Sequence, residues 1–185
     1  MSIISSKRLD LISMTPSFLR ASLEQNVRQA ERILGFALPE GWPEHTDVLS
    51  LRLRQLEADA TLQPWLLRGI VLRSDAVVVG HIGFHTAPGA PYLRQYSPAG
   101  VEFGFTIFPQ YRRRGYAREA SVALMRWAHE VHGVTSFVLS IRPDNKESQS
   151  LARSLGFTRI GSHLDEVDGW EDVLEYQQVQ TSPTS

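Results

Sequence analysis

Arg112-Arg113-Arg114-Gly115-Tyr116-Ala117 joins an apolar, strand-like run over residues 101–108 to an amphipathic helical run over residues 118–131. The first turn of a helix leaves backbone N–H groups without partners, and the helix dipole makes that end attractive to anions. Gly115 lets the backbone approach a ligand closely, and the small side chain of Ala117 also leaves space for a ligand. Arginine side chains can bind phosphate oxygens through two N–H groups at once. The segment therefore predicts a binding site for phosphate groups.

Length and composition indicate one globular domain. The chain has 185 residues, of which 42% are hydrophobic and 21% charged, and this is ordinary for a soluble protein with a substantial core. The formal net charge of −1 argues against a nucleic-acid-binding protein that works through bulk electrostatics. We expect a single domain over residues 1–180 and a disordered tail over residues 181–185.

Cysteine is absent, which excludes disulfides, cysteine zinc sites and a cysteine nucleophile. No apolar run approaches the ~20 residues that span a bilayer, and the N-terminus lacks a signal-peptide core. These features predict a cytoplasmic protein without membrane association. His81 and His85 are four residues apart on an expected strand, hence ~13 Å apart, so we expect no metal site there.

The first half of the chain predicts a strand, two helices and a hairpin. Residues 7–14 alternate as a short edge strand, and Thr15-Pro16 opens a single helix that stops at Gly35. A second helix is expected over residues 44–59. The apolar runs 65–73 and 76–84 indicate a hairpin, and the proline-rich stretch 85–99 indicates a long loop of the kind that often carries function.

The second half predicts a regular alternation of strands and helices. Its expected elements are a strand over 101–108, a helix over 115–131, a strand over 136–141, a helix over 145–155, and strands over 157–161 and 173–179. Gly156 is a plausible helix stop. This order indicates a mixed α/β sheet with crossover helices.

Two blocks of sequence resemble the GCN5-related N-acetyltransferase (GNAT) superfamily. The first is the strand and turn that end at Arg112-Arg113-Arg114-Gly115-Tyr116-Ala117, which follow its Gln/Arg-x-x-Gly-x-Gly/Ala signature. The second follows its Asn-x-x-Ser/Ala-x-x-Leu…Leu-Gly-Phe pattern and comprises Asn145, Ser148, Leu151, Leu155, Gly156 and Phe157. The runs 7–11 and 79–84 look like the family's first and third strands. The branch that looks most similar contains the ribosomal-protein N-terminal acetyltransferases of the RimJ/RimL type.

The resemblance implies a fold and a co-substrate. The fold is α/β (α+β), with a mixed sheet of about six to seven strands, splayed central parallel strands and about four flanking helices. The co-substrate is acetyl-CoA. Its pyrophosphate would rest on the N–H groups of Arg113, Arg114, Gly115, Tyr116 and Ala117, with charge from Arg112 and Arg114. Its pantetheine arm would lie along the strand that contains Phe105, Thr106 and Ile107, where a backbone N–H polarises the thioester.

The resemblance also implies direct transfer of an acetyl group to a primary amine. Glu102 is the candidate base, acting directly or through a water, and Ser148 is the candidate donor to the leaving sulfur. Asn145 would orient the cofactor or cap its helix. Many relatives carry a tyrosine as proton donor where this chain has Ala152. Glu102 is equally compatible with an ordinary strand carboxylate paired with an arginine, and Ser148 with a turn residue.

The acceptor and the activity stay open at this point. The acceptor is either a protein N-terminus or a small amine, and the acidic stretch Asp165-Glu166-Val167-Asp168 could attract a cation or form a solvated turn. The alternative from another class is a catalytically silent module that binds or senses acyl-CoA, which Ala152 keeps open. Both hypotheses predict a monomer or a homodimer, with no nucleic acid, membrane or metal as partner.

Overall fold

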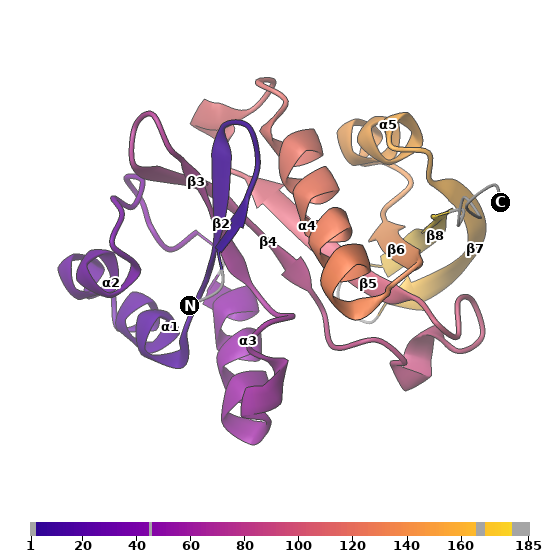
Figure 1. Cartoon of the computed structure of the whole chain (residues 1–185), viewed down its shortest axis with the longest axis horizontal. Helices are drawn as coiled ribbons and strands as arrows, with labels where there is room; N and C mark the ends of the chain where they lie inside the picture. Colours follow the sequence, from indigo (N-terminus) through magenta and orange to yellow (C-terminus); the bar gives the residue numbers. More distant parts are fainter. Residues whose placement is uncertain (1–2, 45, 166–168, 179–185) are drawn as a thin grey trace, which may run out of the picture. The chain divides into compact units, whose positions relative to one another are not determined.

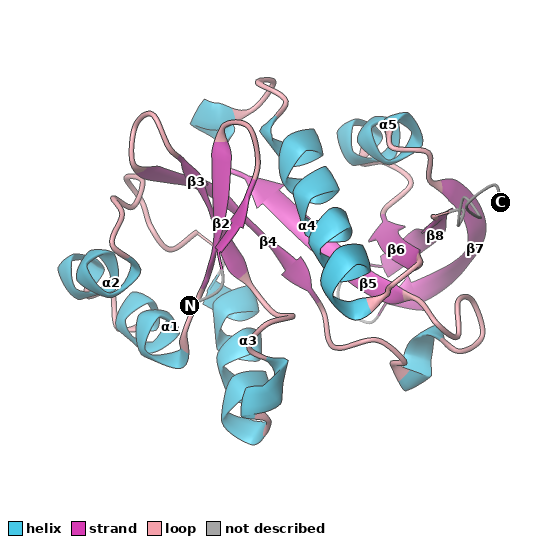
Figure 2. Cartoon of the chain, in the orientation of Figure 1, coloured by secondary structure: helices cyan, strands magenta, loops and turns pink. Residues whose placement is uncertain are grey.

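The structure is a computed structural model (Figure 1), and it describes residues 3–44, 46–165 and 169–178. Two compact units make up the chain. The first comprises Met1–Phe84 and Phe105–Leu124, and the second His85–Gly104 and Met125–Ser185. The expected tail over residues 181–185 lies outside the described residues. Figure 2 shows the helices and strands of the described part.

Four antiparallel strands build the sheet of the first unit. They are β1 (Ile3–Ser5), β2 (Leu9–Ser13), β3 (Arg68–Leu72) and β4 (Val77–Phe84), and each pairs with the next in that order. The strand β5 (Val101–Ile107) ends in the same unit, where the N–H of Phe108 donates to the carbonyl of Val79 at 3.0 Å. The hairpin of β3 and β4 is confirmed.

The expected edge position of the strand over residues 7–14 is wrong. β2 lies between β1 and β3, so β1 takes the edge. β1 has three residues, of which only Ile4 is buried, and so short a strand has no apolar alternation that a sequence pattern could detect.

The helix expected from Thr15 to Gly35 is two helices, α1 (Pro16–Leu23) and α2 (Val27–Leu34). Gln25 between them has a φ of 57°, which ends α1, and the side chain of Asn26 accepts the N–H of Gln29 and starts α2. The outer ends are confirmed, because Thr15 caps α1 and Gly35 closes α2 with a φ of 86°.

The apolar core of the first unit lies between these helices, α3 (Thr46–Ala58) and the sheet. Its centre is aromatic, since the ring of Trp42 lies 5.8 Å from that of Phe18 and 6.0 Å from that of Phe108. The Nε1–H of Trp42 donates to Ser22 Oγ at 3.0 Å, so the buried indole keeps a hydrogen-bond partner. This core therefore fixes Phe108, which directly follows β5.

In the second unit β5 pairs in parallel with β6 (Ser136–Ile141), which pairs antiparallel with β8 (Gly169–Gln177). β8 then pairs antiparallel with β7 (Thr158–Asp165). The parallel register joins Val101 to Phe137 and Glu102 to Val138. Among the described residues, β5 and β6 form no further pair, although Phe103 and Gly104 continue β5. The two parallel strands therefore stop pairing after Glu102. This agrees with the expected divergence.

The expected α/β class with a mixed sheet is confirmed. Neighbouring strands follow the order β1-β2-β3-β4-β5-β6-β8-β7, with β5 contributing residues to both units. The described residues form eight strands and five α-helices, against the expected six to seven and about four, because β1 was missed and α1 and α2 were merged. The remaining helices are α4 (Tyr116–His132) and α5 (Lys146–Ser154).

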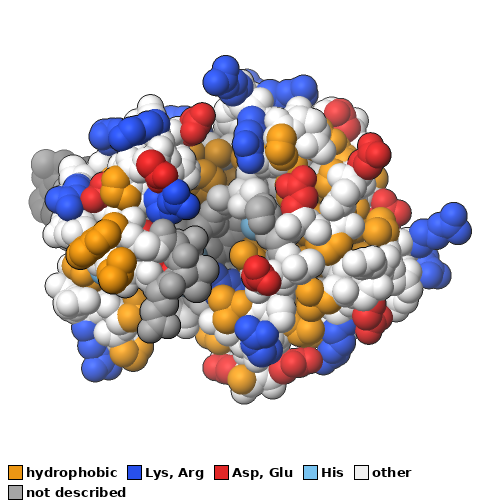
Figure 3. Space-filling view, turned by 180° about the vertical axis from the view of Figure 1, so that it is seen from behind, with side chains coloured by type: hydrophobic (Ala, Val, Ile, Leu, Met, Phe, Trp, Pro, Cys, Tyr) orange, Lys and Arg blue, Asp and Glu red, His pale blue; other side chains and the backbone are white. Residues whose placement is uncertain are grey.

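Figure 3 shows the charged side chains on one face of the molecule. On the face in Figure 3, basic and acidic side chains alternate and do not gather into one basic area. Over the described residues, no helix combines the length and the apolar character that crossing a bilayer requires.

Candidate active site

The turn before α4 has the backbone geometry of an anion site. It follows the short 3-10 helix η3 (Pro109–Tyr111), and both Arg113 and Gly115 are left-handed, with φ of 60° and 77°. The N–H groups of Arg113 to Ala117 are all described, and none is recorded in a hydrogen bond to another protein atom. A turn of alternating hand at a helix start presents such N–H groups to one concave surface, where an anion binds.

Arg112, Arg113 and Arg114 are exposed around this turn. The Nε–H of Arg112 donates to the carbonyl of Ile107 at 2.9 Å, which ties the turn to the end of β5. The residues expected at the pyrophosphate and those expected along the pantetheine, Phe105 to Ile107, therefore belong to one continuous piece of the first unit.

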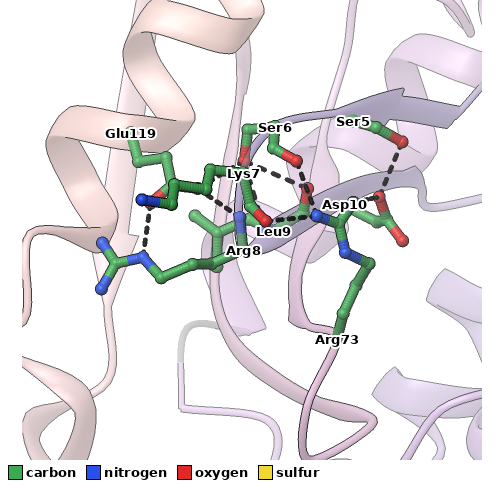
Figure 4. Close-up of polar contacts among 8 residues, drawn as sticks. All are labelled: Ser5, Ser6, Lys7, Arg8, Leu9, Asp10, Arg73 and Glu119. Carbon is green, nitrogen blue, oxygen red and sulfur yellow. Dashed lines mark hydrogen bonds and ion pairs between the residues drawn. The ribbon is translucent and has the colours of Figure 1, made fainter.

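A second group of residues lies near this turn, and the sequence analysis did not predict it (Figure 4). Arg8 and Ser6 lie in the turn between β1 and β2, and Glu119 lies in the first turn of α4. One carboxylate oxygen of Glu119 accepts the hydroxyl of Ser6 and the N–H of Arg8, both at 2.7 Å, and the other accepts the Arg8 Nε–H at 2.7 Å. The guanidinium carbon of Arg8 lies 4.7 Å from the centre of the Tyr116 ring. We call these four residues the Arg8 cluster.

The Arg8 cluster places a further positive charge at the turn. Nη2 of Arg8 lies 3.5 Å from the point that a Cβ on Gly115 would occupy. Partial burial would raise the pKa of Glu119, but the hydrogen bonds from Ser6 and Arg8 outweigh it and lower that pKa, so the carboxylate stays ionised. Local sequence carries no signal for this arrangement, because the partners are more than a hundred positions apart.

Glu102 is buried in the second unit, and its partner is a histidine. Oε2 of Glu102 lies 3.3 Å from Nδ1 of His85, and the backbone N–H of His85 donates to the Glu102 carbonyl at 2.9 Å. The Glu102 side chain is 6% exposed and that of His85 is 37% exposed. Tyr92 and Ser140 also hydrogen-bond to the carboxylate. The partner of Glu102 is therefore a histidine, and not the arginine that the alternative of an ordinary strand carboxylate expected.

These contacts decide the protonation state of Glu102. Burial opposes ionisation and raises the pKa, yet the hydrogen bond and charge of His85, with the hydrogen bonds from Ser140 and Tyr92, lower the pKa of Glu102 to about 2. Such a carboxylate is ionised at any ordinary pH and is a weak proton acceptor. His85 is a functional candidate that the sequence analysis missed, because it considered His85 only for a metal site and found the spacing to His81 too long.

A cavity of about 300 Å³ lies next to Glu102 in the second unit. Tyr92 and Ser140, which hydrogen-bond to Glu102, line it together with Tyr96, His163, Asp165 and Val173. The hydroxyl of Tyr96 donates to the Ser162 carbonyl at 2.9 Å, and the Tyr96 ring packs against Gly161, where a Cβ would come within 2.7 Å of it. The loop over residues 85–99, expected to carry function, thus supplies one wall of a hollow beside the buried carboxylate.

Asn145 and Ser148 lie at the start of α5. The side-chain oxygen of Asn145 accepts the N–H of Ser148 at 3.1 Å, so the expected N-cap is confirmed. Ser148 is half-buried, while Ala152, where many relatives of the expected family carry a tyrosine, is completely buried. Glu102, Asn145 and Ser148 all belong to the second unit, and residues 105–107 and 112–117 belong to the first.

No group of three or more metal-binding side chains lies together within residues 3–44, 46–165 and 169–178.

Comparison with known proteins identifies the family. The model of the acetyltransferase (GNAT) domain matches residues 8–158. The uncharacterized N-acetyltransferase YjdG of Bacillus subtilis is 26% identical over 162 residues, which cover 85% of this chain and 90% of that protein. YnaD of the same organism, also an uncharacterized N-acetyltransferase, is 25% identical over 92 residues, which cover 50% of this chain and only 49% of its own length.

Two further proteins bear on the chemistry. The aminoglycoside N(6')-acetyltransferase type 1 of Acinetobacter baumannii is 28% identical over 116 residues, 63% of this chain and 76% of that protein. The solved structure of RimL, a ribosomal L7/L12 alpha-N-protein acetyltransferase in complex with coenzyme A, superposes with a TM-score of 0.62 at 20% identity. It covers 96% of this chain and 98% of RimL, and at this identity the likeness shows the shared fold. The family match spans the phosphate-type turn, Glu102 and the start of α5, and the chain belongs to the GNAT acetyltransferase family.

Proposed function

We propose that the protein is an acetyl-CoA-dependent N-acetyltransferase that transfers the acetyl group directly to a primary amine. The observation that carries the proposal is the turn from Arg113 to Ala117, whose N–H groups have no recorded protein acceptor and which opens the longest helix. Family membership adds the acyl-transfer chemistry. The structure of RimL, a structural neighbour, is a complex with coenzyme A, which supports the choice of co-substrate.

Each part of the co-substrate is assigned to a part of this chain. The N–H groups of residues 113–117 hold the pyrophosphate, and Arg112 and Arg114 add charge. Phe105, Thr106 and Ile107 receive the pantetheine arm as an added strand, and one of their N–H groups polarises the thioester carbonyl. Asn145 and Ser148, at the start of α5, contact the co-substrate near its sulfur.

The transfer needs an amine without its extra proton. The nitrogen lone pair attacks the thioester carbon, the N–C bond forms, and the C–S bond breaks with the electron pair leaving on sulfur. Glu102 supports loss of the amine proton, and Ser148 stabilises the leaving thiolate by a hydrogen bond, because a serine hydroxyl is a weak acid. Since the chain contains no cysteine, the amine attacks directly and no cysteine acyl-enzyme forms.

The names of the relatives suggest two kinds of acceptor. A named relative acts on aminoglycosides, and several structural neighbours are named as acetyltransferases of ribosomal proteins. The cavity beside Glu102 has a volume of about 300 Å³ and includes Asp165 and two tyrosines, which suits an amine of modest size. We therefore propose a compact primary amine, or the first residues of an extended N-terminus, as the acceptor.

Two measurements test the function. Isothermal titration should show saturable binding of acetyl-CoA, and a library of small amines and N-terminal peptides should contain an acceptor that releases free thiol. Binding without thiol release from any acceptor would favour the silent acyl-CoA-binding module. Absence of binding at millimolar acetyl-CoA would contradict both.

The Arg8 cluster predicts a specific loss of affinity. Replacing Arg8 by alanine removes a guanidinium held beside Gly115, so we expect acetyl-CoA to bind about tenfold more weakly, or about 1.4 kcal/mol. Arg20→Ala is the matched control, because Arg20 forms a surface ion pair of 2.6 Å with Glu57 elsewhere in the same unit. The dissociation constants of both variants, measured by titration calorimetry, check the prediction. An equal effect in the two variants would remove Arg8 from the site.

A further inference from the structure

We propose that His85 accepts the proton of the acceptor amine and that Glu102 positions His85 for this task. The inference rests on the proposed acetyl transfer and assigns one step of it. Its basis is the contact between the two side chains, their unequal exposure, and the place of the imidazole above β5.

In this pair the carboxylate of Glu102 is buried and the imidazole of His85 is partly exposed. Glu102 is 6% exposed and His85 is 37% exposed, so solvent and an incoming amine reach the imidazole and not the carboxylate. Nδ1 of His85 lies 3.3 Å from Glu102 Oε2. A neutral imidazole that donates from Nδ1 keeps Nε2 as its proton-accepting atom, and the carboxylate fixes this tautomer.

The second ring nitrogen lies beside the residue that precedes the segment assigned to the thioester. A Cβ built on Gly104 would come within 3.0 Å of His85 Nε2, so this nitrogen lies against the backbone of Gly104. Gly104 directly precedes Phe105, the first of the residues assigned to the acyl arm. A glycine here keeps room for the ring, so Nε2 lies beside the residue that precedes the segment assigned to the acyl arm.

Glu102 is poorly suited to take the proton itself. Its carboxylate already accepts from His85, Tyr92 and Ser140, and it is buried. The low pKa that results means that protonating Glu102 is unfavourable. Its negative charge instead stabilises the imidazolium that forms when His85 takes a proton. A buried carboxylate that orients and stabilises a more exposed base is the arrangement of many nucleophile-activating sites.

The step balances without another reactant. The ammonium form of the acceptor gives one proton to Nε2 of His85, which leaves a neutral amine and an imidazolium. The amine nitrogen then bonds to the thioester carbon and the thiolate departs. The second amine proton is lost from the new amide nitrogen to solvent or to the thiolate, and His85 returns its proton to solvent. Among the described residues, two further side chains hydrogen-bond to Glu102 of this pair: Tyr92 of the 3-10 helix η2 (Pro91–Leu93) and Ser140 of β6. Of these two, only Tyr92 is titratable.

The first experiment compares variants of the whole chain with an acceptor found by thiol release. We expect His85→Gln to lower kcat at least 100-fold, the usual contribution of a general base, with acetyl-CoA affinity unchanged. Glu102→Gln should lower kcat by a smaller factor, because the imidazole loses its partner and remains present. His132→Gln is the matched control, since it removes an exposed histidine at the end of α4 and should keep full activity.

The second experiment separates a chemical role from a structural one. Wild-type kcat/KM should fall toward acidic pH, because a protonated imidazole cannot accept a proton, and should level off as the pH rises. In His85→Gln it should instead keep rising across neutral pH without levelling off, because only acceptor amine that has already lost its proton in solution can react. Added imidazole should restore part of the activity of His85→Ala, since the ring position is open to solvent. A His85→Gln variant with near wild-type kcat, or one whose kcat/KM levels off as in the wild type, would overturn the inference. Failure of imidazole to restore any activity, with the variant folded, would also count against it.

The outcomes distinguish this inference from the proposed function. If the wild type binds acetyl-CoA and releases thiol but His85→Gln does so equally well, the function stands and the assignment of His85 fails. If the wild type itself releases no thiol with any acceptor, the proposed function fails before His85 is tested.

Discussion

Replacing Gly115 by valine is expected to weaken acetyl-CoA binding at least 100-fold. Gly115 has a φ of 77°, a conformation that costs an L-residue about 1–2 kcal/mol. Its missing side chain also leaves the N–H groups of residues 113–117 open to a diphosphate, and a branched side chain would stand where the backbone must approach the ligand. Titration calorimetry with acetyl-CoA checks the result.

A control substitution at a second glycine distinguishes backbone strain from steric blockage of the ligand. Gly133, just after α4, has a φ of 69° and nothing within 4 Å of a Cβ built on it. Gly133→Val therefore introduces similar backbone strain away from the turn and should bind acetyl-CoA like the wild type. If Gly115→Val binds normally, the pyrophosphate does not lie on this turn. If both variants lose binding equally, the loss comes from strain.

Gly80→Ala is expected to destabilise the fold by about 3 kcal/mol, at the upper end of the usual effect of overpacking. A Cβ on Gly80 would clash with the carbonyl oxygen of Thr106 and lie 3.0 Å from the Cα of Ile107, and both are backbone atoms that cannot turn away. The end of β5 must therefore shift. For a chain of this size, we expect the midpoint of thermal unfolding to fall by about 10 °C, with a loss of acetyl-CoA affinity in whatever remains folded.

Gly69→Ala is the matched control on the adjacent strand. The closest atom to its new Cβ would be the flexible Cε of Met14 at 3.4 Å, which is ordinary contact. This variant should unfold within a few degrees of the wild type. Equal stability of Gly80→Ala and Gly69→Ala in a thermal scan would mean that β4 and the end of β5 do not pack as closely as described.

Most of the fold was predictable because its signals are local. The hairpin of β3 and β4, the strand β6 and the caps at Thr15, Gly35 and Asn145 follow from alternation, capping and glycine stops, which neighbouring residues determine. The break between α1 and α2 was not predicted, because the helical spacing of apolar residues continues through it. The left-handed residue at the break is Gln25, and a glutamine does not signal a left-handed conformation as a glycine would.

The candidate site was predictable where its chemistry lies within a few consecutive residues. The turn from Arg112 to Ala117 carries its own glycine, its charges and its helix start. The pairing of Glu102 with His85 depends on which strands lie together, and the Arg8 cluster joins residues from opposite ends of the first unit. Side-chain partners of this kind are set by tertiary packing, so spacing along the chain could not reveal them.

The central claim is that backbone amides at the start of α4 hold the diphosphate of the co-substrate. The most direct measurement is an amide NMR titration of the 15N-labelled protein with coenzyme A, with resonances assigned over residues 110–120. We predict that the amides of Arg113 to Ala117 show the largest saturable shifts in the spectrum. Saturable binding of coenzyme A with those amides unmoved, and the largest shifts elsewhere, would contradict the account.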